Sequence, residues 1–184
     1  MIYLVRHGLD DENYIGGWSD VDLISDGVKQ IHDVSKYIVD KGLVINKIIS
    51  SDIKRAKSTS DIINKYLNLN IIYDKKLREL DKGDYTGILK SSISIEEIDK
   101  LAKFNIMDKY PNGESMLDLY IRMKIFLENF KDDNVLLVTH RGVINMFYYI
   151  LNGVMIDMDK EKFSVVHGSV HEMDKSKKLI RRIY

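Results

Sequence analysis

The sequence predicts an α/β fold with a mostly parallel central sheet. Two short, continuous apolar runs, residues 2–5 and 135–138, are typical of strands that are covered on both faces. Apolar residues at helical spacing fill the segments between such runs, and strands that alternate with helices are typical of parallel sheets. The 184 residues suit one domain with a sizeable core.

The first half of the chain fits this fold element by element. Residues 9–24 contain Gly16, Gly17 and several aspartates and are predicted to form a loop. A helix is predicted to begin at Ser25, whose hydroxyl can cap it, and to end at Gly42. The elements predicted after it are a strand at Ile48 and Ile49, a helix opened by Asp52 with Ala56, Thr59, Ile62, Ile63 and Tyr66 on one face, and a strand at residues 71–73.

The second half begins with an irregular segment, residues 77–92, and a weakly patterned helix predicted over residues 93–110. Residues 111–113, with the sequence Pro-Asn-Gly, are predicted to form a turn. The clearest helical stripe then consists of Met116, Leu119, Met123, Phe126, Leu127 and Phe130. The remaining predictions are a strand at 135–138, a helix at about 142–152, and strands at 163–173 and 178–184.

The composition excludes several classes of function. Lys plus Arg and Asp plus Glu number 28 each, so no net charge draws the whole protein towards nucleic acid or anionic lipid. There is no cysteine, which excludes disulfides and thiolate metal sites. We see no signal peptide and no apolar run long enough to cross a bilayer, and we therefore expect a cytoplasmic protein.

Charged and ionisable side chains follow the predicted strands directly. Arg6 and His7 follow the first strand and His140 follows the strand at 135–138, while Arg55 lies just after the strand at 48–49. Because ligands bind at the carboxyl ends of parallel strands, we expect these four side chains to converge. Two guanidiniums can bind phosphoryl oxygens, and an imidazole can accept a phosphoryl group covalently. The alternatives are that His7 only caps a strand end and that Arg55 is a solvated helix residue.

Five motifs in this order resemble those of the histidine phosphatase superfamily, which includes the cofactor-dependent phosphoglycerate mutases. They are Leu4-Val5-Arg6-His7-Gly8, Ser51 to Ala56 with Thr59, Leu77 to Leu80 with Gly83 and Gly87, Pro111 to Ser115, and Val138 to Gly142. The resemblance extends over most of the chain. It implies a single-domain three-layer α/β/α sandwich over residues 1–184, with a short helical lid inserted at about 88–114.

The resemblance also implies roles for individual residues. His7 would be the phosphorylated nucleophile, and Glu79 would be the general acid for the leaving oxygen and then the base for water. The alternative for Glu79 is a surface ion pair with Arg78 or Lys82. The catalytic set implied is His7, Glu79, His140, Arg6 and Arg55, and the phosphate-binding or substrate-binding set is Arg6, Asn13, Gly17, Arg55, His140 and Arg141.

One departure from the family pattern concerns the loop after Asn13. Many members carry an arginine a few residues after this asparagine, whereas the stretch from Asn13 to Trp18 has none. Arg141, where the family often has a small residue, either replaces that contact or faces solvent. The remaining histidines, His32, His167 and His171, match no catalytic position of the family.

The implied activity is metal-independent phosphomonoester hydrolysis through a phosphohistidine, similar to that of the small bacterial α-ribazole phosphatases. In the mutases a long insertion carries an arginine pair, but residues 88–110 are short and contain no arginine. The alternatives are bisphosphoglycerate-dependent mutase activity and a non-catalytic member that binds a phosphorylated ligand.

The partner that we expect is a small-molecule phosphate ester, with no cofactor, no nucleic acid and no membrane; a homodimer is one candidate assembly. No HExxH spacing indicates a metal site, and neither G-x-G-x-x-G after a strand nor G-x-x-x-x-G-K-[ST] is present to indicate a nucleotide.

Overall fold

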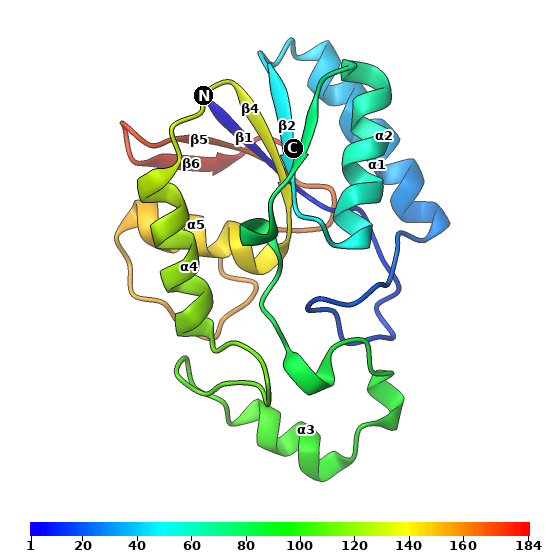
Figure 1. The fold of residues 1–184 in the computed structure, drawn as a ribbon, viewed down its shortest axis with the longest axis vertical. Helices are drawn as coiled ribbons and strands as arrows, with labels where there is room; N and C mark the ends of the chain where they lie inside the picture. The colour runs from blue at the N-terminus through cyan, green and yellow to red at the C-terminus, as the bar shows by residue number, and fades with distance from the viewer.

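One six-stranded sheet organises the computed structural model, which describes all 184 residues (Figure 1). Its order is β3-β2-β4-β1-β5-β6. The four strands from β3 to β1 in this order run parallel, β5 runs antiparallel to β1, and β6 runs antiparallel to β5, so the mostly parallel sheet is confirmed. The strands are β1 (Ile2–Arg6), β2 (Lys47–Ser50), β3 (Ile71–Tyr73), β4 (Val135–Thr139), β5 (Val170–Asp174) and β6 (Leu179–Arg182).

Two helices cover each face of the sheet, which makes the three-layer sandwich that the family resemblance implies. α1 (Ser25–Asp40) and α2 (Lys54–Leu67) pack on one face, and α4 (Met116–Asn129) and α5 (Arg141–Asn152) pack on the other (Figure 1). Alternate residues of β4 enter the two cores: Val135 and Leu137 pack with α4 and α5, while Leu136 and Val138 pack with α1 and α2. Burial on both faces explains the continuous apolar runs.

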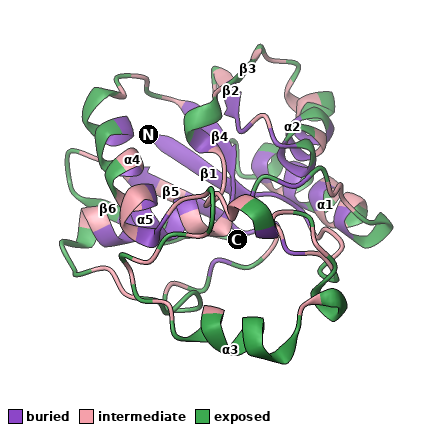
Figure 2. Ribbon diagram, turned by 60° about the horizontal axis from the view of Figure 1, so that its bottom comes forward, coloured by how far each residue is buried: buried purple, intermediate pink, exposed green.

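α3 (Ile95–Ala102) lies apart from both layers, at the bottom of Figure 1. None of its residues is buried, as its exposed colouring in Figure 2 shows. Three short 3-10 turns precede it, at Lys75–Leu77, Gly83–Tyr85 and Lys90–Ser92. No helix of the molecule combines the length and the apolar composition that a membrane crossing requires.

Two predicted helix starts are wrong in detail. Ser25 is the first residue of α1 rather than its cap; Ile24 occupies the cap position, with no side-chain hydrogen bond. Asp52 does not open α2, which begins at Lys54, because both carboxylate oxygens of Asp52 accept hydrogen bonds from Arg78 instead. Tyr66, predicted on the apolar face of this helix, is exposed.

Two predicted elements are shorter than expected. The helix predicted over 93–110 ends at Ala102, because Asn105 and Asp108 bind nearby backbone N–H groups with their side chains and form a turn. The strand predicted at 163–173 begins only at Val170. Ser164 and Gly168 have positive φ angles of 51° and 69°, which an extended strand does not contain.

Candidate active site

His7 lies where the carboxyl ends of the central parallel strands meet. Its backbone N–H donates to the carbonyl of Thr139, at the end of β4, over 2.9 Å. The ring centroids of His7 and His140 are 5.1 Å apart, and Nε of Arg55 is 3.2 Å from Nε2 of His7. The predicted convergence of His7, Arg55 and His140 is therefore confirmed by these distances.

The hydrogen bonds of His7 determine its tautomer. Its Nδ1 is 2.8 Å from the carbonyl oxygen of Gly8, which can only accept, so Nδ1 carries the proton. Nε2 then has a free lone pair, to which Nε of Arg55 donates. Burial, followed by the charges of Arg55, His140 and Arg6, holds the pKa of His7 well below its ordinary value. His7 is therefore neutral at neutral pH, with Nε2 as a nucleophile.

Arg55 is held in one orientation by contacts along its whole guanidinium. The side chain is 2% exposed and donates to the carbonyl of Gly17 over 2.8 Å and to Ser19 over 3.3 Å. The carboxylate of Asp10 lies 3.5 Å from its Nε. Gly17 has a φ of +66°, so glycine suits the turn that presents its carbonyl to Arg55.

Glu79 lies against the N-terminus of α5. One carboxylate oxygen accepts from the backbone N–H of Gly142 over 3.2 Å, and the other accepts from Leu80 over 2.8 Å. A side chain at position 142 would overlap the carboxylate, which gives a physical reason for glycine there. The alternative ion pairs do not form, because Arg78 pairs with Asp52 and no pair joins Glu79 to Lys82.

These side chains face one hollow of about 160 Å³. His7, Arg55, Glu79 and Arg141 all line it, together with Gly17. A nucleophile, guanidinium groups and a carboxylate therefore face a single space, which is the arrangement that phosphoryl transfer requires.

Arg6 and His140 are buried beside this hollow. His140 is fully buried; its Nε2 is 2.8 Å from Oγ of Ser51, and its Nδ1 has no hydrogen-bond partner. Arg6 donates to the carbonyl of Val165 over 2.8 Å, and its Nε is also unpartnered. Burial, reinforced by the charge of Arg141, lowers the pKa of Arg6 to about 10, so the side chain is still charged at neutral pH.

Comparison with known proteins decides the family. The model of the histidine phosphatase superfamily (branch 1) matches residues 2–183. The chain belongs to this superfamily. It is 36% identical over 149 residues to the probable phosphoglycerate mutase GpmB of Escherichia coli O1:K1, an alignment that covers 76% of this chain and 68% of the relative.

Solved structures of histidine phosphatases share the fold. A putative α-ribazole-5′-P phosphatase from Escherichia coli K-12 superposes with a TM-score of 0.82 at 20% identity, covering 98% of this chain and 93% of the other. A mycobacterial glucosyl-3-phosphoglycerate phosphatase gives a TM-score of 0.73 at 20% identity, covering 98% and 94%. At this level of identity the likeness concerns the fold alone.

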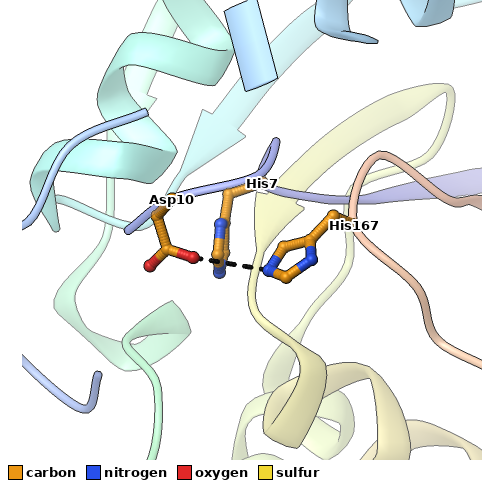
Figure 3. A group of neighbouring side chains, drawn as sticks. All are labelled: His7, Asp10 and His167. Atoms are coloured by element: carbon orange, nitrogen blue, oxygen red, sulfur yellow. Dashed lines mark ion pairs between the residues drawn. The ribbon is translucent and has the colours of Figure 1, made fainter. Parts of the chain in front are cut away.

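Two residues that sequence reasoning missed complete the histidine phosphatase site. Figure 3 shows Asp10 and His167 on either side of His7, with Asp10 paired to His167 at 3.4 Å. Nε2 of His167 also lies 2.6 Å from a guanidinium nitrogen of Arg6. Burial alone would raise the pKa of Asp10, but the hydrogen bond with His167 and the charge of Arg55 outweigh it and lower that pKa. Asp10 thus joins Arg55 to His167, which in turn contacts Arg6.

The position of His167 near His7 could have been predicted from the direction of β5. β5 runs antiparallel to β1, so the amino end of β5 lies at the same edge as the carboxyl end of β1. His167 precedes β5 by three residues, and the N–H of Gly168 donates to the carbonyl of His7 over 3.2 Å. Residues that precede an antiparallel strand therefore lie at the same edge as residues that follow a parallel strand, and His167 is such a residue.

Arg122 is a third residue that the sequence did not single out. It forms an ion pair of 2.8 Å with Glu114 and donates to the backbone carbonyls of Lys76, Arg78 and Glu79. Glu114 in turn accepts from the N–H of Asp81. The pair therefore holds the loop that carries Glu79, which gives a physical role to the Pro111–Ser115 motif.

The structure does not bring Asn13 to the hollow. Its side chain is exposed and donates to the carboxylate of Asp11 over 2.8 Å in a local turn, and it is not among the residues that line the hollow. Arg141 does line the hollow, and it is also paired with Glu161 across the rim. Of these two predicted binding residues, the structure therefore places Arg141 at the hollow and not Asn13.

His7, Asp10 and His167 offer three potential metal ligands whose ligand atoms lie within 4.8 Å of one another (Figure 3). Arg55 approaches Nε2 of His7 and Asp10, and Arg6 approaches Nε2 of His167. A cation at this position would therefore face two guanidiniums at close range, which favours an anion instead.

Proposed function

We propose that this chain hydrolyses small-molecule phosphomonoesters through a covalent phosphohistidine at Nε2 of His7. The observation that carries the proposal is the geometry of His7. Its Nδ1 donates a hydrogen bond to the carbonyl of Gly8, and its Nε2 lies 3.2 Å from Nε of Arg55. A neutral imidazole beside a buried cation can attack a phosphoryl group whose oxygens that cation binds.

In the first step the Nε2 lone pair of His7 forms a bond to phosphorus, and the bond from phosphorus to the ester oxygen breaks. The Nε–H group of Arg55 donates to a phosphoryl oxygen in place of Nε2, and the unpartnered nitrogens of Arg6 and His140 provide further donors. The departing oxygen takes a proton from the carboxyl group of Glu79. The products are an alcohol, a phosphohistidine and the carboxylate of Glu79.

In the second step a water molecule gives its proton to the carboxylate of Glu79 and attacks phosphorus. The bond between phosphorus and Nε2 breaks, which releases inorganic phosphate and restores His7 as a neutral imidazole. The reaction needs no metal ion and no cofactor, because the cationic side chains stabilise the charge on the phosphoryl oxygens.

Trapping the intermediate tests this proposal. Incubation with p-nitrophenyl phosphate and quenching in alkali should leave a phosphoryl group on the peptide that contains His7, since phosphohistidine is stable in base and labile in acid. His7→Ala should abolish both turnover and labelling, whereas His32→Ala, a change outside the site, should alter neither. Turnover by His7→Ala at the wild-type rate would overturn the mechanism.

Mutase activity is the second candidate, favoured by the 36% identity to a probable phosphoglycerate mutase. The absence of arginine from residues 88–110 favours hydrolysis instead. Assay with 3-phosphoglycerate and 2,3-bisphosphoglycerate distinguishes the two: a mutase forms 2-phosphoglycerate, while a phosphatase releases inorganic phosphate. The fold neighbour supports α-ribazole 5′-phosphate as one substrate to include in the same assays.

A further inference from the structure

Three lysines from separate segments line the hollow beside the catalytic groups. Lys82 follows the loop of Glu79, Lys90 begins the 3-10 turn before α3, and Lys160 lies in the connection between α5 and β5. The side chains of these three lysines form no ion pair and donate no hydrogen bond within the molecule. Arg141, by contrast, is paired with Glu161. Asp11, Glu12 and Glu79 line the same hollow but form no ion pair with these lysines, so the three ammonium groups are free to bind an anion.

Both burial and neighbouring charges act on Lys82. Burial is the largest influence on its pKa, and the charges of Lys160, Arg141 and Lys90 lower it further, against the opposing charge of Glu79. The pKa of Lys82 is lowered to about 8. An anion near the ammonium group would relieve this repulsion and favour the protonated form.

The three lysines also lie between two hollows. Besides the hollow at His7, they line a second hollow of about 370 Å³ beneath α3. Its other lining residues are mostly apolar, among them Ile93, Ile98, Leu101 and Tyr110. An ester whose phosphoryl group lies at His7 would extend its leaving group past the lysines towards α3.

We infer that Lys82, Lys90 and Lys160 form a second anion subsite, so that the preferred substrates are phosphomonoesters that carry an additional carboxylate or phosphate. This inference rests on the function proposed above. Arg55 binds the phosphoryl group that His7 attacks, and the ammonium groups of the three lysines bind the second anion. Esters with a neutral leaving group leave these lysines without a partner.

Matched pairs of substrates test the inference. 3-Phosphoglycerate carries a carboxylate where glycerol 3-phosphate carries a hydroxymethyl group, and fructose 1,6-bisphosphate adds a phosphate to fructose 6-phosphate. The wild type should prefer the anionic member by about tenfold or more in kcat/KM, the usual contribution of a charge-assisted hydrogen bond. The two pairs distinguish a carboxylate from a second phosphate as the favoured group.

Lysine variants show whether the preference comes from this subsite. Lys82→Met and Lys160→Met should each reduce the ratio of kcat/KM between the two members of a pair, mainly through KM for the anionic member. Lys160→Arg should retain the ratio, because it keeps the charge. Lys160 is exposed, so its replacement is a safe second variant if Lys82→Met folds poorly. Lys100→Met, an exposed change on α3 outside both hollows, is the matched control.

The outcomes separate this inference from the proposed function. Equal turnover of anionic and neutral esters by the wild type, or ratios unchanged in Lys82→Met and Lys160→Met, would overturn the subsite while leaving the phosphatase intact. Absence of any turnover and of any phosphohistidine would overturn the proposed function itself.

Discussion

The two sides of the hollow are built in different ways. On the side of the sheet, Arg55 and His140 are 2% and 0% exposed, and they form hydrogen bonds with the side chains of His7 and Ser51, which directly follow β1 and β2. On the opposite side, α3 has no buried residue, and Ile95 is 78% exposed. We therefore expect the chemistry to depend on groups that packing holds rigidly, and substrate choice to depend on side chains that can be replaced without disturbing either core.

The largest effect should come from the buried side. Arg55→Lys keeps a positive charge but loses the planar group that contacts His7, Gly17 and Ser19 together. We expect kcat/KM for p-nitrophenyl phosphate to fall by about a hundredfold or more, as when one preorganised donor is removed. Arg181→Lys on the outer strand β6 is the matched control and should leave the rate unchanged. Wild-type activity in Arg55→Lys would show that the reaction does not require the fixed guanidinium of Arg55.

Gly142→Ala tests the position of the general acid. The new methyl group would overlap the carboxylate of Glu79 and push it away from the hollow. Alkyl phosphates, whose leaving groups need a proton, should lose about tenfold or more in kcat, and aryl phosphates should lose less. Glu79→Gln should also reduce kcat more for alkyl phosphates than for aryl phosphates. Because both changes act on the same carboxyl group, kcat of the double variant should be little lower than that of either single variant. Equal losses for both classes of ester would count against this role.

The contact between His167 and Arg6 should have an intermediate effect. Removing the ring in His167→Ala leaves Arg6 with the carbonyl of Val165 as its one remaining side-chain contact, so we expect KM to rise by about three- to tenfold while kcat changes less. His167→Asn supplies an acceptor oxygen and should restore most of the affinity. If alanine and asparagine behaved alike, with thermal melting midpoints equal to that of the wild type, His167 would not position Arg6.

The preference for substrates with a second anionic group should depend on pH. The lowered pKa of Lys82, about 8, means that it is charged below this pH and neutral above it. The preference for 3-phosphoglycerate over glycerol 3-phosphate should therefore decline as the pH rises through about 8, measured as the ratio of kcat/KM. In Lys82→Met the ratio should be low and should no longer change in this window, and an unaltered pH dependence in that variant would assign the titration to another group.

Chelation should have the smallest effect. Guanidiniums approach the one cluster of potential metal ligands, so we expect incubation with EDTA to leave turnover unchanged. Loss of activity that Mg²⁺ or Zn²⁺ restores would show that a cation, and not the arginines, stabilises the phosphoryl oxygens.

The sequence by itself determined the layers of the fold and the central residues of the site. Apolar periodicity is a local property, so it located the central strands β1 and β4, the apolar face of α1 and the stripe of α4. The rule that ligands bind at the carboxyl ends of parallel strands then brought His7, Arg55 and His140 together. Glu79 was indicated only by the resemblance to the acidic motif of the family, and no local pattern indicated its contact with Gly142.

Only the tertiary structure decided which distant loops complete the site. The antiparallel course of β5 brings His167 to Arg6, and the fold of α4 against the acidic loop makes Arg122 a support for Glu79. Asn13 was predicted at the phosphate, but a neighbouring carboxylate binds its side chain. Such contacts depend on strand direction and on competition between nearby polar groups, which local periodicity does not encode.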